Sequence, residues 1–524
     1  MPGHLALILH AHLPFVRHPE HEEFLEEDWL FEAITESYIP LLFMMQRLVS
    51  DGVPFKLTMS ITPTLCAMLR DPLLQSRYVR YLEDRIDLSR REIERNRHHE
   101  QLRALAEFYC RRFTECRQLF VEKWRSDLVS IFAKLQKSGS LELIASAATH
   151  GLLPLLQQSP EAVRAQILIG CEVFREAFGA QPAGFWLPEC AYAPSLDRVL
   201  QQANLRWFIL DTHGVMFGDP PPRCAIFAPY FTSAGPAAFG RDGESSRQVW
   251  SAEEGYPGDP SYRDFYRDIG YDLPADYLWP RSRNRIPRFS GLKYHRVTGR
   301  GTEKNFYDKA SAEKITDMHA NDFLARRRAQ FAKVRDFNSN PIVVTPFDAE
   351  LFGHWWFEGP RFLDLFIRKA AHDQNDFIMT TPSEYLARYP DQQVLAPAAS
   401  SWGDKGYFEV WLDKTNSWIY PHLHAAARRM VEVTRAHKHD TNSGSDRILK
   451  QLARELLLAQ SSDWAFLMKT GTAREYATQR TTDHIRRFNQ LHEQFVTGKV
   501  DEILLSESEA RDNLFPRVNW RYYL

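Results

Sequence analysis

Short runs of apolar residues recur along the first 400 residues and are separated by longer stretches of mixed polarity. Runs of this length between turn residues predict buried β-strands. We predict strands at Leu5–Leu9, Phe55–Ser60, Leu141–Ser146, Gly184–Leu187, Trp207–Leu210, Gln248–Trp250, Ile342–Thr345 and Phe377–Met379. Because helix-sized connections separate them, the pattern predicts a parallel sheet covered by helices, and about eight such units favour a closed α/β barrel.

Nearly every predicted strand is followed by a polar side chain at its C-terminal end. These side chains are His10, His12, Thr62, His150, Glu189, Asp211, His213, Glu253, Asp348, Glu350 and Thr380. In α/β barrels the C-terminal strand ends meet at one face, where catalytic groups collect. We therefore expect the active site at that face.

Helical spacing replaces the strand pattern in two parts of the chain. Residues 76–137 are charge-rich with apolar positions at helical intervals, which predicts a helical insertion. Its run RREIERNRHH interleaves acids with bases, as a solvated helix face does. After Ser400 we predict amphipathic helices at Ser417–His437, Asp446–Gln460 and Ala473–Thr497. The predicted domains are a barrel (1–75 and 138–400), the insertion (76–137) and a C-terminal helical domain (401–524) that contributes to the active-site cleft.

The composition narrows the class of protein. A net charge of −2 removes any electrostatic argument for binding to nucleic acid or to an anionic membrane. The six cysteines form no CxxC pair, so neither a zinc knuckle nor a disulfide framework is indicated. The N-terminal apolar run lacks a basic flank and is broken by His10 and His12, which argues against a signal peptide or a membrane span. We expect a cytoplasmic protein.

The segment GFWLPECAYAP (184–194) places a carboxylate at the tip of a strand among aromatic residues. Glu189 follows Pro188 and lies between Trp186 and Tyr192 in the sequence. Aromatic faces bind the C–H faces of sugar rings, and carboxylates bind their hydroxyls. The alternative is a structural Glu that caps a helix starting near Pro194.

The segment VTPFDAELFGHWWFEG (344–359) repeats the order of strand, proline and acid. Asp348 and Glu350 share one face if the strand continues, whereas a helical turn separates them. Either acid could carry the chemistry, and we favour Asp348 because it comes first after the strand.

Two carboxylates at different strand ends, among tryptophans, meet the needs of glycoside cleavage. One acid protonates the leaving oxygen and the other carboxylate acts at the anomeric carbon. The competing interpretation is a metal-dependent hydrolase, in which the HAH motif joins other strand-end groups as metal ligands. Those groups are His150, His213, Asp211 and Asp348. In a glycosidase the same histidines would bond sugar hydroxyls.

Six motifs resemble those of glycoside hydrolase family 57, specifically its 1,4-α-glucan branching enzyme subgroup. They are HAHLPF, ATHG, GFWLPECAY, RQVWSAEEGYPG, TPFDAELFGHWWFEG and SDWAFLM, in that order along the chain. The resemblance implies a distorted (β/α)7 barrel with a helical insertion, a helical C-terminal domain and no required cofactor or metal. One of the predicted strands, Gln248–Trp250 or Phe377–Met379, is then outside the barrel.

The resemblance also implies roles for particular residues. Glu189 is similar to the catalytic nucleophile and Asp348 to the general acid/base of a retaining double displacement. The implied substrate-binding residues are Arg241, Gly258, Trp402 and Asp463, with His10, His12, His150, Trp250 and Trp411 as neighbours that line the cleft. The implied ligands are α-1,4-glucans such as amylose, glycogen and maltooligosaccharides.

One segment departs from the subgroup. Branching members carry, before the region of Arg241, a mobile loop with an aromatic tip that shelters the intermediate from water. Here residues 217–240 (FGDPPPRCAIFAPYFTSAGPAAFG) are short and rich in proline, with Tyr230 or Phe231 as tip candidates. Because water exclusion separates transfer from hydrolysis, an α-amylase-like hydrolase or a 4-α-glucanotransferase stays open as an alternative.

Overall fold

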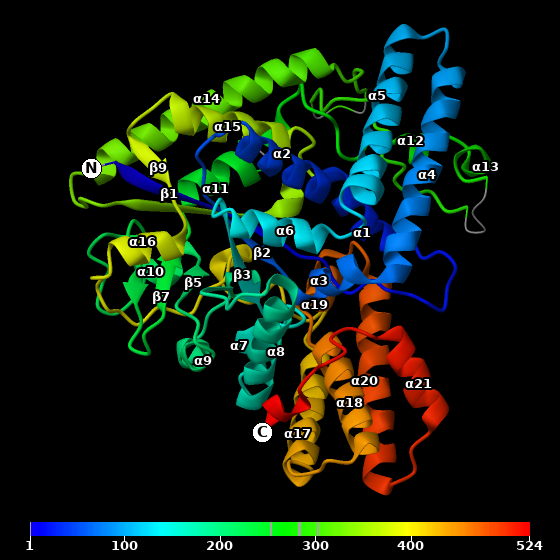
Figure 1. The fold of residues 1–524 in the computed structure, drawn as a ribbon, viewed down its shortest axis with the longest axis vertical. Coiled ribbons are helices and arrows are strands. Elements are labelled where there is room, and N and C mark those ends of the chain that lie inside the picture. The colour runs from blue at the N-terminus through cyan, green and yellow to red at the C-terminus, as the bar shows by residue number, and fades with distance from the viewer. Residues whose placement is uncertain (1, 252–253, 281–284, 300, 302) are drawn as a thin grey trace.

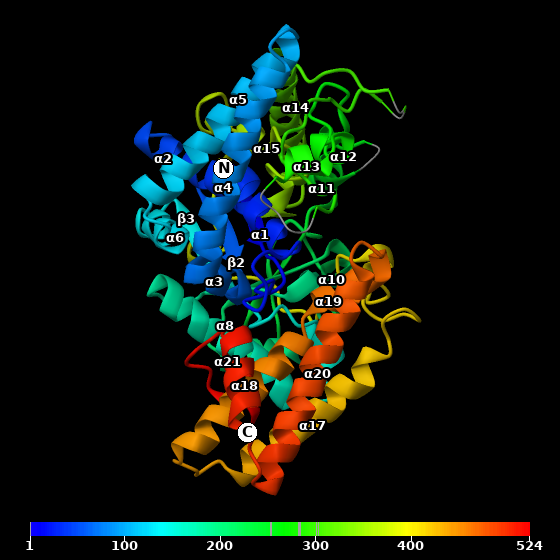
Figure 2. The same ribbon diagram turned by 90° about the vertical axis from the view of Figure 1, so that its right-hand side faces the viewer.

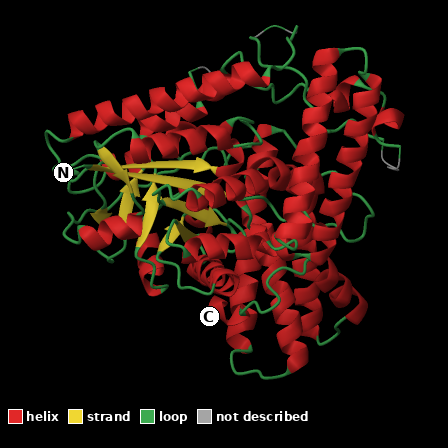
Figure 3. Cartoon of the chain, turned by 45° about the horizontal axis from the view of Figure 1, so that its top comes forward, coloured by secondary structure: helices red, strands yellow, loops and turns green. Residues whose placement is uncertain are grey.

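A curved sheet lies at the centre of the molecule and helices surround it (Figure 3). The computed structural model describes residues 2–251, 254–280, 285–299, 301 and 303–524, so that the predicted strand-end Glu253 lies outside the described residues. The strands are β1 (Gly3–Ala11), β2 (Leu57–Ile61), β3 (Leu141–Ser146), β4 (Gly184–Trp186), β5 (Trp207–Leu210), β6 (Tyr230–Phe231), β7 (Ala237–Gly240), β8 (Ile342–Asp348) and β9 (Phe377–Met379).

Seven parallel strands form a ring. Their order is β7-β5-β4-β3-β2-β1-β8, and a parallel bridge between Arg241, directly after β7, and Val344 of β8 joins the two ends. Strand β6 adds to β7 in the antiparallel direction, and β9 pairs with the first residues of β1. The distorted (β/α)7 barrel is thus confirmed, and β9 is a strand outside the ring.

Strand β1 shows why these runs form barrel strands. All nine of its residues are buried, as expected where helices cover the outside of a parallel sheet. Alternate side chains enter two separate cores, because successive residues of a strand face opposite sides. Ala6 and Ile8 belong to the inner core with Trp207, while Leu5 and Leu7 belong to the outer core under the helices.

The helices up to the end of the barrel are as follows. They are α1 (Glu27–Ala33), α2 (Ile39–Ser50), α3 (Pro63–Arg70), α4 (Pro72–Arg95), α5 (Glu100–Arg117), α6 (Leu128–Lys137), α7 (Leu153–Leu156), α8 (Pro160–Phe178), α9 (Leu196–Gln202), α10 (Thr212–Met216), α11 (Gly243–Trp250), α12 (Ile269–Asp272), α13 (Ala275–Leu278), α14 (Lys309–Val334), α15 (Gly359–His372) and α16 (Pro382–Arg388). Helices α14, α15 and α2 lie side by side over one flank of the sheet (Figure 1).

Several short elements interrupt or follow these helices. The π-helical turns are η1 (Ile34–Tyr38) and η2 (Gln118–Lys123), and the 3-10 turns are η3 (Pro188–Cys190), η4 (Tyr256–Gly258), η5 (Ala349–Leu351), η6 (Asp404–Gly406) and η7 (Trp520–Tyr523). Turn η1 joins α1 to α2 without a break, so that the three form one irregular helix.

Helices α4 and α5 form a long antiparallel pair that projects from the barrel (Figures 1 and 2). Helix α6, also within the predicted insertion, instead packs against β3 and α8.

The C-terminal helices gather at the opposite end of the molecule (Figure 2). They are α17 (Ile419–Ala436), α18 (Ser443–Ala459), α19 (Ser462–Thr470), α20 (Arg474–Thr497) and α21 (Glu502–Arg511). Within the described residues, no helix has the length and apolar character needed to cross a lipid bilayer.

Two predictions about local structure were wrong. Residues Gln248–Trp250 belong to helix α11, whose first turn is capped by the carboxylate of Asp242, and the seventh ring strand is Ala237–Gly240. Tyr230 is not the tip of a mobile loop, since it lies in β6 with 1% of its surface exposed and its hydroxyl donates to the carbonyl of Ala225. Phe231 pairs with β7 and packs against the inner core.

Candidate active site

Glu189 lies at a sharp turn after β4. Both Glu189 and Cys190 have positive φ angles, 62° and 49°. The turn directs the carboxylate toward the C-terminal helices, where Oε2 accepts a hydrogen bond from the indole N–H of Trp402 (2.8 Å) and Oε1 accepts one from the hydroxyl of Ser462 (2.9 Å). Helix α9 begins only at Leu196, so Glu189 is not its cap.

The environment of Glu189 acts on its charge in two directions. Burial raises its pKa, and the hydrogen bonds from Trp402 and Ser462 oppose this by stabilising the carboxylate, but the net shift is upward. The Nδ1 atom of His150 lies 3.6 Å from Oε1 of Glu189 and 2.9 Å from the hydroxyl of Ser462. Glu189 is therefore a positioned carboxylate with donors on both oxygens.

Asp348 is the last residue of β8 and lies in register with His10 of β1. Its carboxyl group makes no hydrogen bond to a described residue. Burial raises the pKa of Asp348 well above its usual range, the charges of Glu350 and Glu189 raise it further, and Arg241 opposes them. Asp348 thus keeps its proton under conditions where an exposed Asp has lost it, as a general acid must.

Glu350 occupies a different setting because the chain makes the helical turn η5 after Asp348. Its Oε1 accepts hydrogen bonds from the phenol of Tyr38 and from the main-chain N–H of His12 (3.2 Å). Burial raises the pKa of Glu350 to about 7, while the bond from Tyr38 opposes the shift. The two acids are therefore separated, and Glu350 faces the turn η1.

Arg241 connects the barrel rim to Trp402. Its guanidinium bonds Asp211 at 3.1 Å and Ser246 at 2.8 Å, and lies 5.5 Å from the centre of the Trp402 ring. His213 lies against Asp211 (3.3 Å) and against the carbonyl of Gly406 (2.6 Å). The ends of β5 and β7 thereby support the loop that carries Trp402.

The histidines of β1 face the interior of the site. His10 is buried, stacks on the Trp186 ring at 4.3 Å, and has its Nε2 3.0 Å from that of His150. Burial lowers the pKa of both His10 and His150 well below the usual value, so both are neutral.

His12 differs from the other two histidines. Its Nε2 lies 2.9 Å from the carboxylate of Asp463, and its Nδ1 lies 3.0 Å from the hydroxyl of Thr62. Burial lowers the pKa of His12, but the charge and the hydrogen bond of Asp463 outweigh it, and the net shift is upward.

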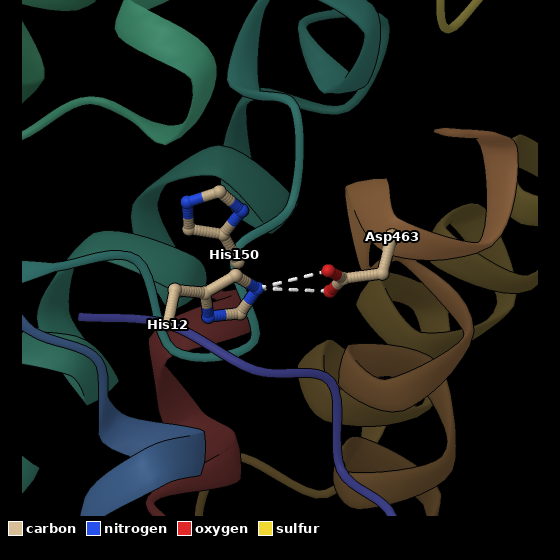
Figure 4. Close-up of side chains that lie close together, drawn as sticks. All are labelled: His12, His150 and Asp463. Atoms are coloured by element: carbon tan, nitrogen blue, oxygen red, sulfur yellow. Dashed lines mark hydrogen bonds and ion pairs between the residues drawn. The ribbon is translucent and has the colours of Figure 1, made fainter. Parts of the chain in front are cut away.

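His12, His150 and Asp463 also come close enough to share a metal ion (Figure 4). The rings of His12 and His150 are nevertheless stacked, with centres 3.8 Å apart and planes 17° from parallel. An imidazole nitrogen binds metal with a lone pair in its ring plane. An ion in the plane of one ring lies outside that of the other, so this arrangement suits hydrogen bonding better than metal binding.

A second group that could surround a cation is fully buried among the C-terminal helices. It consists of Glu455, His484 and Asp512. The guanidinium of Arg487 lies 3.1 Å from Glu455 and 2.9 Å from Asp512. Arg487 already supplies the positive charge, and the cluster is a structural ion network.

Three predicted substrate-binding residues lie apart from these contacts. Gly258 is the exposed last residue of turn η4, and Trp250 ends α11 with 40% of its surface exposed. Trp411 is buried in the core of the C-terminal helices and contacts Gly403 next to Trp402. None of the three contacts Glu189 or Asp348 within the part of the chain that the structure describes.

Sequence reasoning missed Ser462 and Tyr38. Ser462 precedes Asp463 in the motif SDWAFLM, and only the fold shows that its hydroxyl reaches Glu189. Tyr38 lies in a helical segment without a motif and is 312 residues from its partner Glu350.

Two sequence-family models match this chain. Residues 6–398 match the model of glycosyl hydrolase family 57. The chain belongs to this family. Residues 422–523 match a second model, described as the C-terminal region of 1,4-alpha-glucan branching enzyme.

Three similar proteins have printed names that bear on activity. The 1,4-alpha-glucan branching enzyme of Thermococcus kodakarensis is 33% identical, covering 99% of this chain and 78% of its own. The crystal structure of the α-amylase AmyC from Thermotoga maritima is 42% identical with a TM-score of 0.93, covering 100% and 99% of the two chains. That of a family 57 branching enzyme from Pyrococcus horikoshii is 33% identical with a TM-score of 0.89, covering 100% and 97%.

Proposed function

We propose that this protein is a retaining 1,4-α-glucan branching enzyme. The observation that supports this most is the contrast between the two carboxyl groups. Burial raises the pKa of both groups, but Glu189 receives two hydrogen bonds that favour its ionised form, whereas Asp348 receives none from the described residues and its pKa is raised well above the usual range. A nucleophile must lose its proton more readily than the proton donor, and this difference meets that need.

In the proposed first step, Glu189 attacks the anomeric carbon of an α-1,4 linkage. Asp348 gives its proton to the departing glycosidic oxygen, and the glucan stays covalently bound to Glu189. In the second step Asp348, now ionised, takes the proton of an incoming glucan 6-hydroxyl. That oxygen displaces Glu189 and forms the α-1,6 branch.

The proposed ligands are α-1,4-glucans, namely amylose, glycogen and maltooligosaccharides. Trp402 lies beside Glu189 and Arg241 lies beside the Trp402 ring, so these two are candidates for contacts with the sugar. Asp463 and His12 are proposed to bind hydroxyls, as are the imidazoles of His10 and His150. A cytoplasmic location stays a prediction that is consistent with six free cysteines.

The decisive experiment incubates the protein with amylose and counts new α-1,6 linkages against new reducing ends. We expect linkages to outnumber reducing ends, and reducing ends without branches would reject the branching proposal. Glu189→Gln should abolish both products, while Asp348→Asn should lower turnover by roughly 10²- to 10⁴-fold, as loss of a general acid does. Activity that is unchanged by a chelator would reject a metal-dependent hydrolase.

A specific observation favours hydrolysis as the second candidate. Residues 230–240, directly before Arg241, fold as the packed hairpin of β6 and β7, in which Tyr230 is buried and Phe231 packs against the inner core, so neither forms the tip of a mobile lid. The structure at 42% identity is also named as an α-amylase. The same count of linkages and reducing ends distinguishes the two.

A further inference from the structure

Three exposed aromatic side chains lie near one another on the segment that follows η4 and on the loop after β8. Tyr266, Tyr271 and Trp355 have 75%, 55% and 48% of their surface exposed. We refer to these three residues as the aromatic platform. Their indole and phenol groups make no side-chain hydrogen bond to a described residue. Exposed aromatic clusters of this kind are more often binding surfaces than accidents of folding.

Two further rings, those of Phe265 and Phe289, contact the three side chains of the platform and connect them to one another. Trp355 stacks on Phe265, with centres 4.4 Å apart and planes 29° from parallel, and Tyr266 meets the same ring edge-on at 5.0 Å. Phe289 lies 5.4 Å from Phe265 and 5.3 Å from Tyr271. The five rings therefore form one continuous set of contacts, although they come from three parts of the sequence.

A buried cation supports the inner rings. The ammonium group of Lys293 lies 4.2 Å from the centre of Phe265 and 4.0 Å from that of Phe289, distances at which a cation attracts an aromatic face. Lys293 itself is 1% exposed, and its ammonium group donates a hydrogen bond to the carbonyl of Phe265. Lys293 thus helps to fix the two inner rings on which the platform packs.

The segment that carries the platform is also fixed. The carboxylate of Asp268 accepts main-chain hydrogen bonds from Gly270 (2.7 Å), Ser290 (2.9 Å) and Gly291 (3.0 Å). These bonds join the start of α12 to the strand-like stretch that holds Phe289. A fixed platform loses little conformational entropy when a ligand binds.

One member of the platform, Trp355, lies on the loop that follows the proposed general acid. Trp355 follows Asp348 by seven positions, and its main-chain N–H donates to the carbonyl of Glu350. A glucan chain with more glucosyl units than the catalytic centre can hold would extend over the surface that this loop helps to form. Tryptophan and tyrosine combine an apolar face with a hydrogen-bonding edge, which matches a glucosyl ring better than a purely aliphatic protein patch.

We propose that Trp355, Tyr266 and Tyr271 bind an α-1,4-glucan chain outside the catalytic centre. This inference rests on the proposed function for its choice of ligand. The platform holds long chains and leaves the reaction of short ones unchanged.

The test measures amylose binding by affinity electrophoresis, in the inactive Glu189→Gln background so that turnover does not interfere. Replacing Trp355, Tyr266 and Tyr271 by Ala should weaken the binding of amylose by about tenfold or more, since each aromatic contact contributes a factor of a few. Trp355→Phe should restore part of it. The control is Phe337→Ala, which removes a similarly exposed ring elsewhere.

Kinetics with the active enzyme provide the second readout. We expect a higher KM for amylose in the triple variant and an unchanged kcat/KM for maltoheptaose. If kcat/KM fell by the same factor for both substrates, the substitutions would act through Asp348, and the inference would be overturned. Unchanged amylose binding in the folded variant would overturn it too, as would a loss of self-association without a loss of amylose binding. Binding of amylose by a protein that forms neither branches nor reducing ends would support the platform while rejecting the proposed activity.

Discussion

The phenol of Tyr38 donates a hydrogen bond to the carboxylate of Glu350. Tyr38 is the last residue of the π-helical turn η1, and Glu350 follows Asp348 by two positions. Since π-helical turns are rare and concentrate at functional sites, this one has an evident role. It positions an acid whose charge acts on the proposed proton donor.

Replacing Glu350 should change the pH dependence of the reaction. The charge of Glu350 raises the pKa of Asp348, so Glu350→Gln lowers that pKa and Asp348 loses its proton at lower pH. We expect the alkaline limb of the kcat/KM profile to move to lower pH. Tyr38→Phe should move it in the same direction by less, because loss of the donor keeps Glu350 neutral to a higher pH. If the alkaline limb stays in place, the charge of Glu350 does not act on the pKa of Asp348.

The indole of Trp402 should support the nucleophile. Its N–H donates to Glu189 at 2.8 Å, and a hydrogen bond to a charged group contributes roughly 1.5–3 kcal/mol. We expect Trp402→Phe to lower kcat by about 10- to 100-fold, and to move the acidic limb of the profile to higher pH because the pKa of Glu189 rises. Trp418→Phe, at another partly exposed tryptophan, is the control. A kcat profile equal to that of the parent would contradict the assigned role.

The pair of His12 and Asp463 should make stability depend on pH. The pKa of His12 is raised in the folded state, so the stabilisation is complete below the unfolded value of about 6.5 and is lost as pH rises through the folded value. Asp463→Asn should therefore lower Tm more at about pH 5.5 than at about pH 9. The control Asp391→Asn, at an exposed position, should leave Tm unchanged at both pH values. Equal losses at both pH values would show that His12 is uncharged.

Gly353 should not tolerate a side chain. Its φ is +119°, and a Cβ there would lie 1.8 Å from the carbonyl oxygen of Glu36 in η1. Gly353→Ala should cost more than the roughly 1–3 kcal/mol of a strained backbone, because η1 must also move. Gly235→Ala has a similar positive φ of +114° and open space around it, so it isolates the backbone cost. Thermal unfolding of both variants gives the comparison, and equal losses would rule out the clash.

Removal of the C-terminal part should abolish activity. A chain of residues 1–400 lacks Trp402 and Ser462, the two donors to Glu189, and Asp463, the partner of His12. Co-expression of 401–524 as a separate chain should restore part of the turnover. A folded 1–400 fragment with full turnover would contradict the prediction.

The strands that the sequence revealed are those with a mostly apolar run, since a strand buried on both faces has few polar positions. Ala237–Gly240 was missed because its small residues resemble a loop, and Gln248–Trp250 was misassigned because three residues are too few to show a helical period. The other seven predicted strands and the three predicted C-terminal helices lie within a few positions of those observed, whereas long helices such as α14 and α15 were not predicted.

The candidate site also combines features that local sequence signals predict with features that they do not. Glu189 and Asp348 could be predicted as candidates because each follows an apolar run and a proline, which are local signals. The contacts that distinguish the two acids are not local. Trp402 lies 213 residues from Glu189, and Ser462 lies 273 residues away. No periodicity or spacing encodes such a pairing, which depends on how the C-terminal helices dock.

The distance along the chain between His12 and Asp463 has a consequence for biosynthesis. His12 emerges from the ribosome 451 residues before its partner Asp463. Until α19 has docked, His12 and Glu189 lack their C-terminal partners, so a nascent chain holds an unfinished site. The proposed catalytic site is therefore complete only after the C-terminal helices have been made and have packed against the barrel.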